Sequence, residues 1–243
     1  MRIYLLAFLL VSLSATPLRP SEQSPRLVVW NVSQGQWITY SNDESCWHFD
    51  VGGEFLRGSV LKRLCKNKIN KVFLSHWDWD HIGLLPRLKK IKTPSCLGLR
   101  PLGSSSAKKE ALLKDLPTCA PQTLSEAEVY SPLFKKGDSN SQSHVVLFKG
   151  FLIPGDSPVK EELLWIHQLR SLSKTRVLIL GHHGSRTSSS EELLNKIPLI
   201  KMSVASARWS RYGHPHPKTL FRLAKHRIPL LRTEDWGHIV FEF

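Results

Sequence analysis

The stretch Ser75-His76-Trp77-Asp78-Trp79-Asp80-His81 decides the fold of this chain. It places four potential metal ligands within six residues, between an apolar run typical of a buried strand and a helical pattern. His76 and Asp78 lie two residues apart, so in an extended backbone both side chains point to one face. A turn into the helix brings Asp80 and His81 to a neighbouring point. Such a segment can hold two divalent ions, and its imidazole and carboxylate ligands suit Zn, Mn or Fe. The alternative is a charged surface turn.

Two later segments carry further candidate ligands. The apolar run 151–153 ends in Pro154-Gly155-Asp156, and an Asp at this place could bridge two ions, although alone it is more often a turn residue. The apolar run 177–180 ends in Gly181-His182-His183-Gly184-Ser185. A single His at a strand end is usually structural, whereas a His pair between glycines favours a metal site.

Taken in order, these motifs resemble those of the metallo-beta-lactamase superfamily, and within it the C-terminal soluble domain of ComEC-type DNA-uptake proteins. H-x-D-x-D-H, G-D and G-H-H-G-S are followed by Tyr212-Gly213-His214-Pro215. Residues 31–36 (NVSQGQ) and 50–53 (DVGG) are similar to D-V-G-Q-G-D and D-T-G-G of that family. The resemblance extends over about residues 27–243. It implies an α/β (α+β) four-layer αββα metallo-beta-lactamase sandwich, with the site at one edge of two sheets.

The resemblance also implies a ligand set for two divalent ions, Zn or Mn. The implied ligands are His76, Asp78, Asp80, His81, Asp156 and one of His182 or His183, with His182 expected because it stands at the strand end. Asp78 stands where most of the superfamily has His, and a harder oxygen ligand shifts the preference toward Mn. There are two departures: Asn31 and Gln36 replace the two Asp of D-V-G-Q-G-D, and Asn140 stands near where other members place a ligand His.

The chemistry expected of such a site assigns roles to further residues. Two ions lower the pKa of a bridging water, and Asp80 or Asp156 could hold the resulting hydroxide or take its proton. Asp80 and His214 are the predicted catalytic residues. Residues 184–190 offer backbone N–H groups, hydroxyls and a cation at a helix start, which favours an anion site. The predicted substrate-binding residues are Ser185, Arg186, Ser188, Tyr212 and His214. The residues predicted to support the ligands are Asn31, Asn140, Thr233 and Asp235.

The charge balance narrows the choice of substrate. The 243 residues include 34 Lys and Arg against 20 Asp and Glu, a net charge of +14, which favours nucleic acid or an anionic membrane face as a partner. The fractions of hydrophobic (41%) and charged (22%) residues exclude a disordered or fibrous chain. We therefore predict a metal-dependent nuclease or phosphodiesterase acting on DNA, with no stable protein partner. The alternatives are a hydrolase of a small ester, lactone or nucleotide on the same fold, and a degenerate member that binds DNA or a partner without turnover.

The first 14 residues have the outline of a secretory signal peptide, with a basic start, an apolar run and small residues. Export to the periplasm or medium is therefore expected, and an uncleaved N-terminal anchor is the alternative. The hydrolase domain is predicted to span residues 26–243, with an insertion at about 92–136, where proline and serine are frequent.

The four cysteines allow three disulfide pairings in an exported chain. Cys96 and Cys119 bracket a polar segment of the predicted insertion, which favours that pair; four free thiols are the alternative. No C-x-x-C spacing is present, so a cysteine metal site is not expected.

Overall fold

The computed structural model describes residues 24–120, 125–133 and 138–243. The predicted signal peptide or anchor at residues 1–14 lies outside the described residues. No helix within these ranges has the length and apolar character needed to cross a bilayer.

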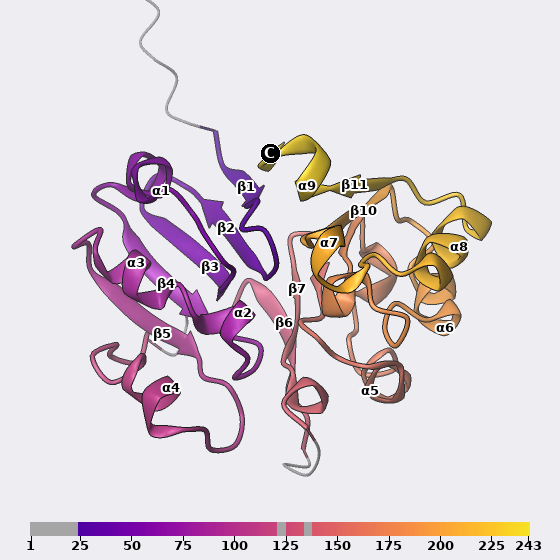
Figure 1. Ribbon diagram of the computed structural model, residues 1–243, viewed down its shortest axis with the longest axis horizontal. Helices are drawn as coiled ribbons and strands as arrows, with labels where there is room; N and C mark the ends of the chain where they lie inside the picture. Colours follow the sequence, from indigo (N-terminus) through magenta and orange to yellow (C-terminus); the bar gives the residue numbers. More distant parts are fainter. Residues whose placement is uncertain (1–23, 121–124, 134–137) are drawn as a thin grey trace, which may run out of the picture.

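Two sheets of six strands form the centre of the molecule (Figure 1). The first sheet has the order β12 (Ile239–Glu242), β1 (Arg26–Val29), β2 (Trp37–Ser41), β3 (Ser45–Val51), β4 (Ile69–Phe73) and β5 (Ser95–Leu99). The second has the order β11 (Leu230–Arg232), β10 (Met202–Ala205), β9 (Val177–Ile179), β8 (Phe151–Ile153), β7 (Val145–Phe148) and β6 (Ala127–Tyr130).

Aromatic side chains join the inner faces of the two sheets. The ring of Trp47 on β3 stacks on Phe73 of β4 at 5.4 Å between centroids and on Phe148 of β7 at 5.1 Å. These rings belong to one buried apolar cluster that draws on both sheets. Because large aromatic side chains bury much apolar surface, this cluster stabilises the packing of the two sheets against each other.

Helices cover the outer faces, so the layers are αββα, as predicted (Figure 1). The first sheet carries α1 (Gly58–Cys65) and α3 (Leu85–Lys89), and the second carries α5 (Val159–Trp165), α6 (Glu191–Lys196) and α8 (Pro217–Lys225). The short helices are α2 (Trp79–Ile82), α4 (Ala107–Ala111), α7 (Trp209–Tyr212) and α9 (Thr233–Trp236). The strands β2 and β3 are buried along their whole length because both faces of the sheet are covered.

Strand direction brings the motifs together. In the first sheet β3, β4 and β5 run parallel, and in the second β8, β9, β10 and β11 run parallel. Loops that follow parallel strands emerge at the same edge of a sheet. The hydrogen bond from His144 N to Ser75 O (3.0 Å) ties the two sheets together at this edge, where the ligand motifs lie.

The segment predicted as an insertion, 92–136, contributes to both sheets. It contains β5, the edge strand of the first sheet, α4, and β6, the edge strand of the second. The predicted Cys96–Cys119 disulfide is confirmed, and it joins β5 to the segment after α4. The remaining pair, Cys46–Cys65, joins β3 to the end of α1.

Candidate metal centre

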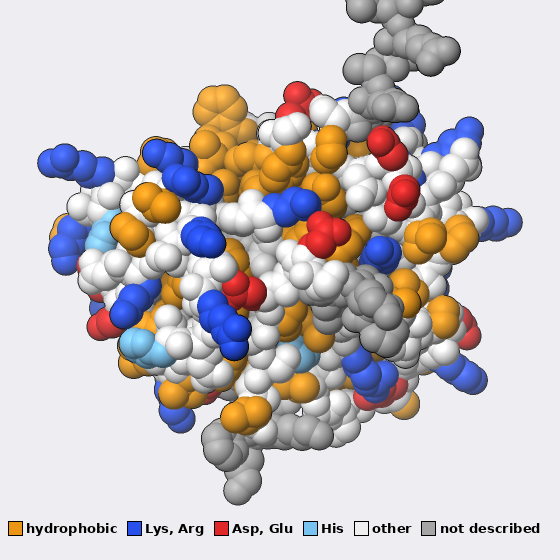
Figure 2. Space-filling view, turned by 180° about the vertical axis from the view of Figure 1, so that it is seen from behind, with side chains coloured by type: hydrophobic (Ala, Val, Ile, Leu, Met, Phe, Trp, Pro, Cys, Tyr) orange, Lys and Arg blue, Asp and Glu red, His pale blue; other side chains and the backbone are white. Residues whose placement is uncertain are grey.

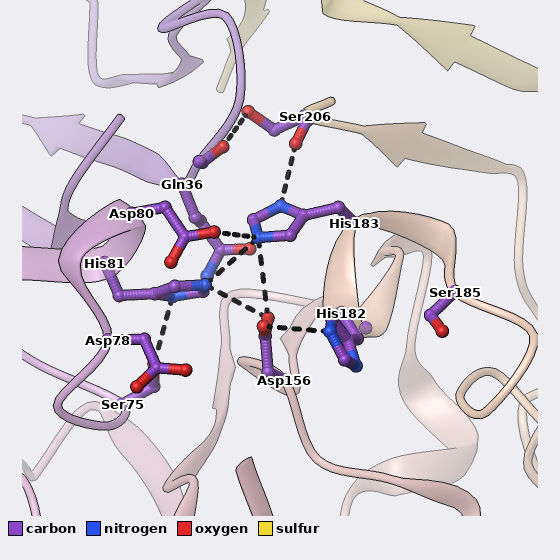
Figure 3. A network of polar contacts seen from close by, with 12 residues as sticks. Gln36, Ser75, Asp78, Asp80, His81, Asp156, His182, His183, Ser185 and Ser206 are labelled. Carbon is purple, nitrogen blue, oxygen red and sulfur yellow. Dashed lines mark hydrogen bonds and ion pairs between the residues drawn. The ribbon is translucent and has the colours of Figure 1, made fainter. Parts of the chain in front are cut away.

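Seven carboxylates and imidazoles from three loops converge between the two sheets (Figure 3). The loop after β4 brings His76 and Asp78, and α2, which follows it, brings Asp80 and His81. The loop after β8 brings Asp156, and the loop after β9 brings His182 and His183. The sequence analysis named all seven as candidates, but it expected only one of His182 and His183, with His182 preferred, to be a ligand.

The first group of ligand atoms surrounds one oxygen of Asp156. His76 Nε2 lies 3.8 Å and His182 Nε2 lies 3.7 Å from Asp156 Oδ2. Asp78 Oδ2 lies 3.6 Å from His76 Nε2. Two imidazoles and two carboxylates at these separations form a donor set that suits one Zn or Mn ion.

The second group surrounds the other oxygen of Asp156. His81 Nε2 lies 3.0 Å and His183 Nε2 lies 3.8 Å from Asp156 Oδ1. His183 Nε2 also lies 3.1 Å from Asp80 Oδ2 and 3.2 Å from His81 Nε2. Asp156 therefore stands between two groups, with one carboxylate oxygen facing each.

Two buried atoms of the cluster lack hydrogen-bond partners. His76 Nε2 and Asp156 Oδ1 are buried, yet neither makes an aligned hydrogen bond, although each lies within 4 Å of other ligand atoms. An unpaired buried polar atom is costly, so such atoms call for a partner. A bound cation would supply one, and the residues present therefore fit a divalent metal centre.

Hydrogen bonds behind the ligands fix which nitrogen faces the centre. His81 Nδ1 donates to Asp50 Oδ2 (2.7 Å), so its Nε2 is presented to the ligand group. Asp50 also accepts bonds from Ser75 N (2.7 Å) and Gln36 Nε2 (2.8 Å), and the Ser75 hydroxyl lies 2.9 Å from His76 Nδ1. Groups of this kind orient the ligands and tune the bound metal.

The loop after β9 has an unusual backbone. His182 and His183 both have left-handed φ angles, 48° and 56°. His183 Nδ1 donates to Ser206 O (2.9 Å), which presents Nε2 to the second group. At Gly184, with φ 88°, a Cβ would lie 2.8 Å from the Cβ of Pro215, so glycine lets the turn after α7 pack on this loop. Strained backbone of this kind gathers at functional sites.

Glycine also lets α2 lie close to the end of β3. A Cβ at Gly52 would overlap the carbonyl group of Asp80, and Gln36 N donates to that same carbonyl oxygen (2.9 Å). The backbone that carries Asp80 is therefore held directly against the first sheet.

The charges of the cluster are strongly coupled. Burial opposes a charge on His81, but the carboxylates of Asp156 and Asp50 outweigh it and raise its pKa well above the usual value. Burial would raise the pKa of Asp80, but the hydrogen bond from His183 and the charge of His81 hold that pKa well below its usual range. A centre this rich in charge is stable only when acids and cations are paired.

His214 lies at the mouth of the cluster. Its ring is 6.0 Å from that of His182 and 6.1 Å from that of Tyr212. Burial, with the positive charges of His183 and His182, lowers the pKa of His214 to about 4, so its imidazole is neutral at pH 7. Its Nδ1 is buried without a hydrogen-bond partner. A neutral imidazole here can still donate one N–H to an anion.

The predicted anion site at residues 184–190 needs correction. The backbone N–H groups of Ser189 and Ser190, at the start of α6, donate to the carboxylate of Glu162, with Ser190 N at 2.8 Å. Arg222 donates to the carbonyl groups of Ser188 and Ser189. A carboxylate from α5 thus already occupies this helix start, and an external phosphate cannot use it.

The side chains of that segment lie in different places. Ser188 is fully buried, and its hydroxyl donates to the carbonyl groups of Gly181 and Ser185, so its predicted contact with substrate is wrong. Ser185 is buried, with its hydroxyl 3.0 Å from that of Thr187. Arg186 is exposed. The predicted roles of Ser185 and Arg186 stay predictions.

The predicted supporting residues do not act as a set. Asn31 bonds to Ser33 N and to His238, and no described contact joins it to a ligand. Asp235 pairs with Arg232 at 2.9 Å, and Thr233 is buried at the start of α9 without a described contact to the cluster.

Asn140 lies closer to the cluster. It follows Ser139, whose hydroxyl accepts a bond from Trp77 N. The hydrogen bond from His76 lowers the pKa of Asp78, and the Ser139 hydroxyl adds to that shift. Asn140 Oδ1 is buried without a partner. The residues that the sequence analysis missed are Asp50, Ser75 and Ser206, and only the D-V-G-G motif signalled one of them.

Comparisons with known proteins agree with this fold. No protein-family model matches the chain. Competence protein ComA of Neisseria gonorrhoeae is 28% identical over 233 residues, covering 90% of this chain and 32% of that protein. ComE operon protein 3 of Bacillus subtilis (strain 168) is 25% identical (87% and 30%), and Recombination protein 2 of Haemophilus influenzae is 28% identical (87% and 27%). The chain thus spans about a third of the length of these relatives.

Solved structures share the architecture. The metallo-beta-lactamase fold protein YhfI from Bacillus subtilis has a TM-score of 0.53 at 12% identity, covering 90% of this chain and 100% of its own. A diphosphatase of the PhnP family has a TM-score of 0.55 at 13% identity (90% and 98%), and Zn²⁺-bound PqqB from Methylobacterium extorquens has 0.51 at 10% (89% and 100%). The chain has the metallo-beta-lactamase fold and resembles the ComEC-type competence proteins.

Proposed function

We propose that this chain is a metal-dependent hydrolase that cleaves phosphodiester bonds in DNA. The observation that carries the proposal is the position of Asp156, whose two oxygens face two separate groups of imidazole and carboxylate ligands. Divalent ions held by these residues would stabilise the charge that develops when a phosphodiester is attacked.

The candidate ligands divide between two divalent ions. When bound, two divalent ions supply an activated water and polarise a phosphoryl oxygen. His76, Asp78, Asp156 and His182 would hold one ion. Asp80, His81, Asp156 and His183 would hold the other.

Proton transfer and hydrogen bonding to the substrate require side chains that the substrate can reach. The Asp80 side chain is one-third exposed, whereas that of Asp156 is 4% exposed, so Asp80 Oδ1 is the better placed oxygen to accept the proton of the attacking water. The neutral imidazole of His214 at the mouth donates an N–H hydrogen bond to a phosphate oxygen or to the leaving oxygen.

Charge supports a polyanionic substrate. The net charge of +14 attracts nucleic acid, because phosphate contacts supply much of its affinity for proteins. Relatives named competence and recombination proteins support DNA over RNA, although this chain spans only about a third of each. The two disulfides support an oxidising, exported location, because such bonds persist mainly outside the cytosol.

The test combines metal content with cleavage. The purified chain is expected to bind two equivalents of Zn²⁺ or Mn²⁺ and to cut end-labelled DNA with metal but not with chelator. Asp80→Asn should abolish cleavage and leave the circular dichroism spectrum unchanged. The matched control is Asp115→Asn, since the Asp115 side chain is 80% exposed and outside the site.

Other outcomes would support different functions. Hydrolysis of bis(p-nitrophenyl) phosphate or a small ester without cleavage of DNA would indicate a small-molecule hydrolase. DNA binding with less than one metal equivalent and no turnover would indicate a non-catalytic binding protein. No cleavage by a chain loaded with two ions refutes the nuclease.

A further inference from the structure

Two exposed aromatic side chains flank the mouth of the candidate metal centre. Trp79 on α2 is 43% exposed and Tyr212 on α7 is 58% exposed. Both line a pocket of about 240 Å³ that also includes Asp80 of the second ligand group. The two helices come from opposite halves of the sandwich (Figure 1), so the pocket opens between the two halves beside the ligands.

Basic side chains lie on these rings. Lys108 Nζ and Lys109 Nζ, both on α4, lie 5.3 Å and 5.6 Å from the centroid of the Trp79 ring. The guanidinium of Arg211 lies 5.5 Å from the centroid of the Tyr212 ring. Such contacts hold cations over aromatic faces, so each side of the mouth offers both a ring and a positive charge.

The lysines reach toward the ligands as well. Lys109 Nζ lies 3.9 Å from Asp78 Oδ1 of the first ligand group, and its side chain is only 17% exposed. A phosphate bound at the centre would therefore find an ammonium group directly beside it. Glu54 is the other acid lining the pocket, and its carboxylate pairs with Arg208 at 2.9 Å and more loosely with Arg211 at 3.9 Å.

We propose that Trp79, Lys108, Lys109, Arg211 and Tyr212 form a rim that binds single-stranded nucleic acid. Bases would stack on Trp79 and Tyr212, and flanking phosphates would contact the three cations. Aromatic platforms within a basic groove are the means by which proteins bind single strands, because every exposed base offers a ring face. The inference rests on the proposed function, since it names the strand form taken by the same site.

A duplex could not use this rim in the same way. Its bases are stacked on one another, so only its phosphates are available to the cations. Lys and Arg side chains are also spread over the back of the molecule rather than gathered in one stripe (Figure 2). General charge therefore attracts both forms, and the exposed rings give the preference for a single strand.

The test is equilibrium binding in EDTA, so that no turnover is needed. Fluorescence anisotropy with labelled oligothymidine and with a labelled duplex is expected to show at least tenfold tighter binding of the single strand. Tyr212→Ala and Trp79→Ala should each weaken single-strand binding about fivefold or more, from the usual cost of losing one stacked base, and leave duplex binding unchanged. The matched control is Trp236→Ala, an exposed Trp (70%) on α9 that does not line the pocket.

Salt dependence tests the cations separately. The double variant Lys108→Ala/Lys109→Ala should reduce the slope of log K against log salt by about 1.4, because each phosphate contact of a single strand contributes about 0.7. Its control is Lys174→Ala/Lys201→Ala, two exposed lysines that precede β9 and β10, at the opposite end of these strands from the ligands. The lysine and Tyr212 variants keep the test valid if Trp79→Ala does not fold.

The outcomes separate this inference from the nuclease proposal. Three results would refute single-strand binding by the rim without affecting the nuclease proposal. They are equal affinity for single strand and duplex, an unchanged salt slope in the lysine variant, and equal losses of affinity in Trp236→Ala and Tyr212→Ala. If the wild-type chain does not cleave DNA but binds the single strand selectively in EDTA, the nuclease proposal is refuted and the proposed rim is supported.

Discussion

Replacement of Asp50 by Asn is the sharpest test of how the centre is held. The Asp50 carboxylate is buried and accepts bonds from Ser75 N, the Ser75 hydroxyl, Gln36 Nε2 and His81 Nδ1. All its described partners use it as an acceptor. An Asn amide presents one NH₂ group, so in either orientation a donor would face donors. With the NH₂ group toward His81 the imidazole would lose its fixed tautomer, and with it toward Ser75 N the loop that carries His76 would lose its bond.

The size of the effect follows from the role of Asp50 behind a ligand. Loss of a group that orients a metal-bound His costs about tenfold to a hundredfold in metal affinity, which corresponds to about 1.4 to 2.8 kcal/mol. The second group, which contains His81, should lose its ion first. The first group is affected less, because the Ser75 hydroxyl can still contact His76.

The assay is competition for Zn²⁺ against a chromophoric chelator, with the two sites fitted separately. Asp43→Asn is the matched control, because Asp43 is exposed in the turn between β2 and β3 of the same hairpin. Circular dichroism and Trp fluorescence establish that both variants are folded. A folded Asp50→Asn variant with both dissociation constants within twofold of wild type would refute the reasoning.

Two further predictions concern stability. Burial lowers the pKa of His48 from 6.5 to about 4, so the folded chain keeps it neutral while the unfolded chain takes up a proton below pH 6.5. The free energy of unfolding should therefore fall by about 1.4 kcal/mol per pH unit from pH 6.5 toward 4 on account of this group. Urea titrations at several pH values should show a shallower fall of this free energy in His48→Gln than in the wild type. An equal dependence on pH in the two proteins contradicts the prediction. The Cys96–Cys119 disulfide closes a loop with a sequence separation of 23, so the double Ala variant should lose about 3 kcal/mol in urea unfolding, and an unchanged midpoint contradicts this.

The ligand cluster was predictable because its signals are local. His76 to His81 lie in one short segment, and Asp156 and the His pair each follow an apolar run that ends in a loop. Strand ends of one sheet edge meet in space, so a local pattern was enough to place the seven residues together once the family resemblance gave the topology.

The supporting contacts were not predictable because they join distant segments. Asp50 lies 31 residues before His81, its hydrogen-bond partner. Glu162 lies 27 residues before Ser189, whose N–H group donates to the Glu162 carboxylate. A helix start that looked open to phosphate in the sequence is closed by that carboxylate. Short edge strands were missed for a related reason: β5 and β6 are only partly buried and lack a strong apolar pattern.

The His pair shows where reasoning from sequence reached its limit. The family resemblance implied that only one of His182 and His183 is a ligand, and in a regular strand successive side chains would point to opposite faces. Two consecutive left-handed residues break that alternation, and each imidazole faces a different oxygen of Asp156. The extra imidazole, His182, lies in the first group, 3.7 Å from Asp156 Oδ2, so that group contains two imidazoles. Gln36 bonds to the carboxylate of Asp50 (2.8 Å). Both groups of ligand side chains are thus present, although Asn31, Gln36 and Asn140 depart from the family pattern.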